Sequence, residues 1–260
     1  MTFIAKKSLG QNFLHAPQVI SAMIHAAQVK AGDTVLEAGP GKGVLTEKLL
    51  EAGAKVVAVE KDDRAIPFLS EKFKEETAAG QLELVHGDIL AFDPTPLRQY
   101  KIVANIPYYI SGEFLRKFLE SDTAPLCIVV MLQKELAKRI VEEKGSILGI
   151  SVRAYGNPTY VTSVPRKFFR PIPNVDSAVL LIENISKNFF ESGKIDEKRF
   201  FEVLKAGFAH KRKVLIKNLE EKMASADLKK LWERENWSFT LRAEELSLDD
   251  WKKIICFPQK

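Results

Sequence analysis

The chain has 260 residues, 46% of them hydrophobic and 28% charged, which suits a globular protein with one large core and a smaller appendage. Its longest apolar run covers residues 126–132, far too short to span a membrane, and the N-terminal stretch lacks the pattern of a cleaved signal peptide. Membrane and secreted proteins are therefore not expected. Two cysteines far apart in the sequence fit a reduced, cytoplasmic protein.

The net charge of +5 is unevenly placed along the chain. Residues 186–260 carry 17 Lys and Arg against 13 Asp and Glu, a net of +4, whereas the first 185 residues carry 22 against 21. A polar arm at the start holds Lys6 and Lys7, and no acid occurs before Asp33. Two basic ends favour a polyanion such as nucleic acid, although a solvated lysine-rich surface explains the charge equally well.

Between residues 33 and 184, short apolar strand candidates alternate with amphipathic segments, which predicts a parallel α/β sheet. The predicted strands are 34–38, 55–60, 82–86, 101–105, 126–132, 160–164 and 177–183. The predicted helices are 19–27, 64–77, 112–120 and 134–142, and a break is expected at 144–150. The last two strands follow each other without a helix, so they should form an antiparallel pair at the edge. We expect residues 1–185 to form this domain and 186–260 to form a small helical domain.

Three glycines follow the predicted strand 34–38 and precede a helical pattern that starts at Val44. Glycine takes positive φ freely and lets a ligand approach the backbone, so strand, glycine turn and helix predict a nucleotide site. The spacing Gly39-x-Gly41-x-Gly43 matches neither a dinucleotide fingerprint nor a P-loop. It fits a turn beside a ligand without a pyrophosphate, as in methyltransferases that use S-adenosylmethionine.

Carboxylates end the next two predicted strands. Glu60 can accept both hydroxyls of a ribose, and Asp88 can accept a hydrogen bond from an adenine amino group. A glycine loop with two surface acids is the alternative interpretation. An acid at each of two neighbouring strand ends favours the nucleoside site.

The predicted strand 101–105 ends in Asn105-Ile106-Pro107-Tyr108, at the edge where open α/β sheets bind ligands. The Asn105 side-chain carbonyl and the Ile106 backbone carbonyl can each accept one N–H of an adenine amine, and Tyr108 can stack on the base. Two such acceptors favour a pyramidal nitrogen whose lone pair faces a sulfonium methyl. A polar strand end with a proline turn is the alternative.

A second loop, residues 168–177, lies before the last predicted strand and is stiffened by Pro171 and Pro173. It could hold an aromatic ring against a flipped base. Alternatively, Phe168 and Phe169 are core residues beneath the loop.

In the C-terminal part, residues 205–219 hold five basic side chains and no acid, which suits contacts with phosphates. The five are Lys205, Lys211, Arg212, Lys213 and Lys217. A helix is expected here, with Phe201, Leu204, Phe208 and Leu215 on its core face. The four histidines show no metal-ligand spacing with either cysteine, so no metal is expected.

Four motifs in this order resemble the ribosomal RNA adenine N6-dimethyltransferases. They are Gln-Asn-Phe-Leu at 11–14, Glu-Ala-Gly-Pro-Gly-Lys-Gly at 37–43, Asn-Ile-Pro-Tyr at 105–108 and Phe-Arg-Pro-Ile-Pro-Asn-Val-Asp-Ser at 169–177. The resemblance covers nearly the whole chain and is closest to the bacterial small-subunit branch, the one linked to kasugamycin sensitivity. It implies a Rossmann-like methyltransferase sheet and dimethylation of two adjacent adenines near the 3′ end of 16S ribosomal RNA. It also implies S-adenosylmethionine as cofactor and the assembling 30S particle as partner of a monomer.

The resemblance assigns roles to particular residues. Contacts to S-adenosylmethionine are expected from Asn12, Leu14, Gly39, Gly41, Glu60, Asp88 and Asn105. The segment from Asn105 through Ile106 and Pro107 to Tyr108 would position the adenine amine, and Phe169 would stack on the target base. RNA contacts are expected from Lys6, Lys7 and the five basic residues of the C-terminal stretch.

Two departures from the family pattern leave the proposed chemistry untouched. Ala38 stands where a larger aliphatic residue is usual, and Lys211 replaces the first arginine of a basic triplet. One alternative is a macrolide-resistance methyltransferase that acts on large-subunit RNA, and the basic triplet followed by Asn218 and Leu219 argues against it. The other is a non-catalytic nucleic-acid-binding protein of the same fold. Intact Glu60, Asp88, Asn105 and Tyr108 argue against it.

Overall fold

The computed structural model describes residue 6 and residues 10–142 and 144–258. Its residues form two compact units. The first comprises Met1–Lys138 and Asn157–Ile185, and the second comprises Arg139–Gly156 and Ser186–Lys260. The boundary expected after residue 185 is one point where the chain passes between units. Residues 139–156, which we expected in the first domain, group with the C-terminal helices instead.

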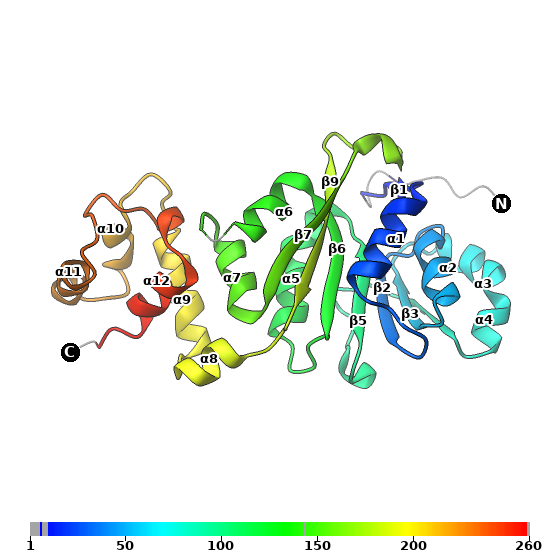
Figure 1. Cartoon of the computed structure of the whole chain (residues 1–260), viewed down its shortest axis with the longest axis horizontal. Coiled ribbons are helices and arrows are strands. Elements are labelled where there is room, and N and C mark those ends of the chain that lie inside the picture. Colours follow the sequence, from blue (N-terminus) through cyan, green and yellow to red (C-terminus); the bar gives the residue numbers. More distant parts are fainter. Residues whose placement is uncertain (1–5, 7–9, 143, 259–260) are drawn as a thin grey trace. The chain divides into compact units, whose positions relative to one another are not determined.

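The first unit is built on a seven-stranded sheet with the order β4-β3-β2-β5-β6-β9-β7 (Figure 1). The strands are β2 (Thr34–Ala38), β3 (Lys55–Glu60), β4 (Leu82–His86), β5 (Lys101–Asn105), β6 (Cys127–Gln133), β7 (Asn157–Val164) and β9 (Ser177–Glu183). Strands β2 to β6 pair in parallel, and β9 runs antiparallel to both β6 and β7. The predicted parallel sheet with an antiparallel pair at its edge is therefore confirmed, although β7 begins three residues earlier than expected.

Helices connect these strands. They are α1 (Pro17–Ala26), α2 (Val44–Glu51), α3 (Ala65–Lys72), α4 (Lys74–Ala78), α5 (Ser111–Glu120) and α6 (Lys134–Val141), the last of which crosses the boundary between units. The single helix expected at 64–77 is interrupted at Phe73, which is 3% exposed because its ring packs beneath the glycine turn. A short two-stranded sheet that the sequence did not predict pairs β1 (Phe13–Leu14) with β8 (Phe169–Arg170).

The core of the first unit extends over both faces of the sheet. Alternate strand residues, among them Val35, Val56, Val103 and Val129, belong to one cluster with the buried side chains of α1 and α2. The residues between them, such as Leu36, are also fully buried. Parallel strands are covered by helices on both faces, which is why these strands read as nearly continuous apolar runs.

The second unit is helical. Its helices are α7 (Ile147–Tyr155), α8 (Asn188–Gly193), α9 (Glu197–Gly207), α10 (Leu215–Leu219), α11 (Ser225–Arg234) and α12 (Leu248–Ile255). We expected a break at 144–150, but α7 already begins at Ile147, so the expectation is wrong for the second half of that range. Ser146 Oγ accepts a hydrogen bond from Gly149 N at 3.0 Å and caps the helix. Rings of Tyr155, Phe190 and Phe200 cluster in its core. Within the described parts of both units, no helix is long and apolar enough to cross a membrane.

Candidate active site

A cavity of about 250 Å³ opens at the carboxyl ends of β2, β3, β4 and β5. Strand β2 lies between β3 and β5 in the sheet, so the chain order reverses beside it, which is the usual ligand position in open α/β sheets. The loops after these four strands line the cavity together with residues 10–14 and part of α1. Every residue predicted from the sequence to contact the cofactor lies on its wall.

The glycine turn after β2 forms one side of the cavity. Gly39 has φ +68° and Gly41 has φ +57°, a backbone conformation that residues with a Cβ adopt at a cost. A Cβ on Gly41 would lie 2.8 Å from the Phe13 ring, whereas one on Gly39 would meet no atom within 4 Å. The turn is thus closed by the arm at Gly41 and open at Gly39, where a ligand can approach the backbone.

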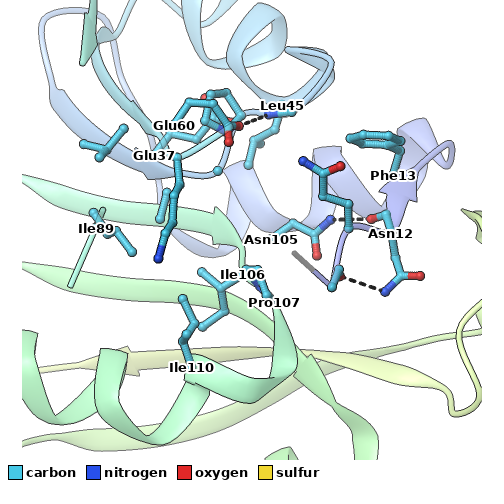
Figure 2. A pocket seen from close by; sticks show the side chains of 18 of the residues that line it. Asn12, Phe13, Glu37, Leu45, Glu60, Ile89, Asn105, Ile106, Pro107 and Ile110 are labelled. Carbon is cyan, nitrogen blue, oxygen red and sulfur yellow. Dashed lines mark hydrogen bonds between the residues drawn. The ribbon is translucent and has the colours of Figure 1, made fainter. Parts of the chain in front are cut away.

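Glu60 ends β3 beside this turn and is only 5% exposed. One carboxylate oxygen accepts from Gly41 N at 3.0 Å and the other from Asp62 N at 2.8 Å. Burial raises the pKa of Glu60, against the effect of these backbone bonds. Each oxygen keeps acceptor capacity for a further donor. Figure 2 shows Glu60 on the cavity wall near the second buried acid, Glu37.

Asp88, after β4, lines the same cavity. Its carboxylate accepts from Lys61 Nζ at 2.7 Å and from Leu90 N at 2.9 Å. The bond to Lys61 lowers the pKa of Asp88, so the group is an ionised acceptor at neutral pH. Lys61 was not among the predicted site residues, because a lysine after a strand carries no distinctive signal.

Asn105 ends β5 opposite Glu60. Its side-chain Nδ2 donates to the backbone carbonyl of Asn12 at 3.3 Å, which fixes the amide so that Oδ1 is the remaining acceptor (Figure 2). Ile106, Pro107 and Tyr108 follow along the cavity wall.

The Tyr108 ring is held at its far end. Its hydroxyl lies 2.5 Å from Oγ of Ser177, a fully buried side chain at the start of β9. This contact joins the loop that follows β5 to the end of the proline-containing loop. The sequence motif at 169–177 therefore supports the position of Tyr108.

The N-terminal arm crosses the cavity as a strap. Gln11 Nε2 donates to Asp62 Oδ2 at 2.8 Å beyond the end of β3, and the next residue, Asn12, is held by Asn105 at the end of β5. The strap therefore spans the strands on either side of β2. Asp62 is 2% exposed and also binds Arg64, whose ion pair lowers the pKa of Asp62. Sequence reasoning assigned neither Gln11 nor Asp62 a role, since their contact joins positions 51 residues apart.

Glu37 is a further site residue that sequence reasoning missed. It is 1% exposed and lines the cavity from β2, and its Oε2 has no hydrogen-bond partner among the described residues. Burial raises the pKa of Glu37 to about 8, and the nearby charge of Glu60 adds to the shift. A buried acid next to three glycines was a visible signal, since acids are rarely buried without a partner.

The structure does not bring Phe169 to the cavity. This ring is 1% exposed in the core, because β8 pairs with β1 and places Phe169 opposite Leu14. The ring therefore does not line the cavity in this structure, and its expected stacking on a target base stays a prediction. The alternative, a core residue beneath a loop, describes its position.

We expected the basic stretch of the second unit to form one helix, and that expectation is wrong. Helix α9 ends at Gly207 and α10 begins at Leu215, so Lys211, Arg212 and Lys213 lie exposed on the turn between them. Asn218 stabilises this turn, because its Nδ2 donates to Gly207 O at 2.7 Å and to His210 O at 3.2 Å.

The remaining predicted RNA contacts differ in their surroundings. Lys205 is exposed on α9, whereas Lys217 forms an ion pair with Glu220 at 2.9 Å. Lys6 is exposed, and Lys7 lies outside the described residues. No group of three His, Cys, Asp or Glu side chains that could hold a metal ion occurs in the described part of the chain.

Comparison with known proteins identifies the family. The model of the ribosomal RNA adenine dimethylase family matches residues 2–259. Ribosomal RNA small subunit methyltransferase A of Dehalococcoides mccartyi is 41% identical over 97% of this chain and 88% of that protein. The protein of the same name from Fusobacterium nucleatum is 36% identical over 98% of both chains.

Solved structures agree on the fold. A dimethyladenosine transferase from Plasmodium falciparum superposes with a TM-score of 0.74 at 26% identity, over 93% of this chain and 95% of that one. The 23S rRNA methyltransferase ErmE superposes with a TM-score of 0.76 at 23% identity, over 94% and 98%. The fold is thus the Rossmann-like fold of S-adenosylmethionine-dependent methyltransferases. The chain belongs to the ribosomal RNA adenine dimethylase family and is an adenine N6-dimethyltransferase.

Proposed function

We propose that the chain dimethylates the N6 atoms of two adjacent adenines near the 3′ end of small-subunit ribosomal RNA, with S-adenosylmethionine as methyl donor. The observation that carries the proposal is the meeting of Glu60, Asp88 and the Asn105–Tyr108 segment in one cavity at the carboxyl edge of the sheet. The first two suit a nucleoside, and the third suits an adenine amine.

The cavity fits the cofactor by its donors and acceptors. Glu60 offers carboxylate oxygens to ribose hydroxyls, Asp88 offers an ionised acceptor to the adenine amino group, and the open backbone at Gly39 admits a close approach. Asn12, Leu14, Gly41 and Asn105 complete the set of residues that would hold it. When bound, S-adenosylmethionine supplies a methyl group on a positively charged sulfur.

The chain's own residues prepare the adenine amine. Its lone pair is delocalised into the ring, so it is a poor nucleophile. Asn105 Oδ1 and the Ile106 carbonyl would each accept one of its N–H groups and favour a pyramidal nitrogen. Asn12 supports this role because its carbonyl holds Asn105 Nδ2 and leaves Oδ1 as the acceptor. The Tyr108 ring, anchored by Ser177, would stack on the base. No strong base is required, since the proton can leave after transfer.

The RNA would be held by cations of both ends of the chain. Lys211, Arg212 and Lys213 are exposed on one turn, and none forms an ion pair with a described carboxylate, so they suit phosphates. We extend the proposal to Lys6, Lys7, Lys205 and Lys217. It further implies a monomer that acts on the assembling 30S particle in the cytoplasm.

The competing function is methylation of large-subunit RNA. The relatives named for the small subunit are 41% and 36% identical to the chain, whereas the likeness to the 23S rRNA enzyme, at 23% identity, concerns the fold alone. Incubation with labelled S-adenosylmethionine and either unmethylated small-subunit particles or large-subunit RNA separates the two. We expect label only in the small-subunit RNA, as dimethyladenosine at two adjacent positions near its 3′ end. Label in the large-subunit RNA, or none, would overturn the proposal.

A further inference from the structure

An exposed phenyl ring stands at the tip of a rigid turn in the second unit. Phe239 is 53% exposed and follows α11 in the chain. The Ser238 carbonyl accepts from Trp232 Nε1 at 3.2 Å and from Leu241 N at 3.1 Å. The Ser238 hydroxyl lies 2.7 Å from the Thr240 hydroxyl and accepts from Thr240 N at 3.2 Å. These bonds fix the backbone on both sides of Phe239, whose ring is exposed to solvent.

This turn is joined to the basic turn of the same unit. Leu215 N donates to Leu241 O at 2.7 Å, and Leu215 is only two residues after Lys213. Because Phe239 is likewise two residues before Leu241, its Cα lies no more than about 20 Å from that of Lys213. The ring and Lys213 therefore lie within reach of one short segment of a polynucleotide.

The charged residues within these two segments are all cations, and acids occur only beyond them, at Glu220, Glu235, Glu244 and Glu245. Residues 205–217 hold five cations and no acid, and residues 236–242 add Arg242 and no acid. A singly exposed apolar side chain is common and needs no explanation by itself. Here a fixed backbone, an outward ring and a run of cations coincide. Proteins that bind unpaired nucleic acid combine aromatic rings for bases with cations for phosphates.

We propose that Phe239 is a stacking site for an unpaired base of the ribosomal RNA whose backbone is held by Lys211, Arg212 and Lys213. The proposal rests on the RNA methyltransferase function above and adds a second point of base recognition, within the second unit. A phenyl ring is uncharged, so stacking on it does not contribute to the salt dependence of binding. Loss of the ring should therefore weaken binding by about tenfold at every salt concentration.

The test compares dissociation constants of full-length variants for unmodified transcribed small-subunit ribosomal RNA across a potassium chloride series. We expect Phe239→Ala to give a line of log affinity against log salt that lies below the wild-type line and parallel to it. Phe239→Tyr keeps an aromatic ring and should bind as the wild type does. Leu126→Ala is the matched control, because Leu126 is similarly exposed, at 52%. It precedes β6, at the amino end of the strands, whereas the cavity lies at their carboxyl ends. We expect this variant to bind the RNA as the wild type does.

The outcomes separate this inference from the function on which it rests. If the wild type binds and methylates the RNA and Phe239→Ala binds it with the same affinity, the stacking site is overturned and the proposed function stays intact. A lower melting temperature for Phe239→Ala would identify a core role and also overturn it. Failure of the wild type to bind small-subunit RNA would overturn both.

Discussion

Replacing Glu60 with glutamine tests the proposed cofactor site directly, because the change keeps the volume of the side chain and removes its charge. Both carboxylate oxygens already accept a backbone N–H, from Gly41 and from Asp62. A carboxylate can accept further bonds at both oxygens, whereas an amide accepts at one end and donates at the other. We therefore expect Glu60→Gln to bind S-adenosylmethionine more weakly.

The size of the effect follows from the loss of charge. Hydrogen bonds to a charged group contribute roughly 1.5–3 kcal/mol and neutral ones roughly 0.5–1.5 kcal/mol. With two ribose hydroxyls, the variant loses about 2 kcal/mol of binding free energy, or about thirtyfold in dissociation constant.

Stability should change much less, because two effects oppose each other. Burial raises the pKa of Glu60, so the charged carboxylate is less favourable in the folded than in the unfolded protein, and its removal stabilises the fold. An amide that faces a backbone N–H destabilises it. We expect a melting temperature close to that of the wild type.

Isothermal titration calorimetry with S-adenosylmethionine measures the affinity, and differential scanning fluorimetry measures the melting temperature. Asp63→Asn is the control, since it removes a charge from an exposed neighbour that does not line the cavity. Because the pKa of Glu60 is raised, wild-type affinity should also fall as the pH decreases through that pKa, while the affinity of Glu60→Gln stays level. An affinity of the variant within about twofold of the wild type would refute the assignment of Glu60.

Three further changes test other parts of the site. Burial raises the pKa of Glu37 from 4.5 to about 8, so the wild-type free energy of unfolding should decline as the pH rises between these values. The free energy of unfolding of Glu37→Gln, measured with urea, should lack that decline. Asn105→Ala should lower turnover by about ten- to hundredfold at saturating cofactor and RNA with a much smaller effect on cofactor affinity, and equal turnover would exclude its acceptor role. Replacing Lys211, Arg212 and Lys213 together with Gln should make the slope of log RNA affinity against log salt shallower by about two to three, and an unchanged slope would mean that these cations are merely solvated.

Local sequence patterns were sufficient for the sheet and for much of the candidate site. Strand-length apolar runs, glycines that alternate after a strand and acids at strand ends are short-range features. The position of a strand's carboxyl end therefore predicted that Gly39, Glu60, Asp88 and Asn105 line one cavity, and the structure places them there. Their roles in binding and catalysis stay predictions.

Helical spacing predicted a single helix across the basic stretch, whereas contacts in the tertiary structure end α9 at Gly207. Of the expected stripe, Leu204 and Leu215 are buried and Phe201 and Phe208 are half-buried. The helix nevertheless ends at Gly207, and the chain from there to Leu215 is a turn. Asn218 bonds two carbonyls of that turn, and a Cβ on Gly207 would lie 2.3 Å from the Trp251 ring. Such contacts depend on how α9, α10 and α12 pack, which periodicity does not record.

By itself, the sequence determined the parallel sheet, the glycine turn and the acids and amide at its edge, because each depends on backbone conformation and periodicity over a few residues. Only the tertiary structure decided which groups meet across long separations. Gln11 reaches Asp62 and Asn12 reaches Asn105 because the arm crosses the ends of β3 and β5. Phe169 is buried because β8 pairs with β1. Burial also raises the pKa of Glu37, since the charge of a carboxylate is stabilised by water that the folded chain excludes.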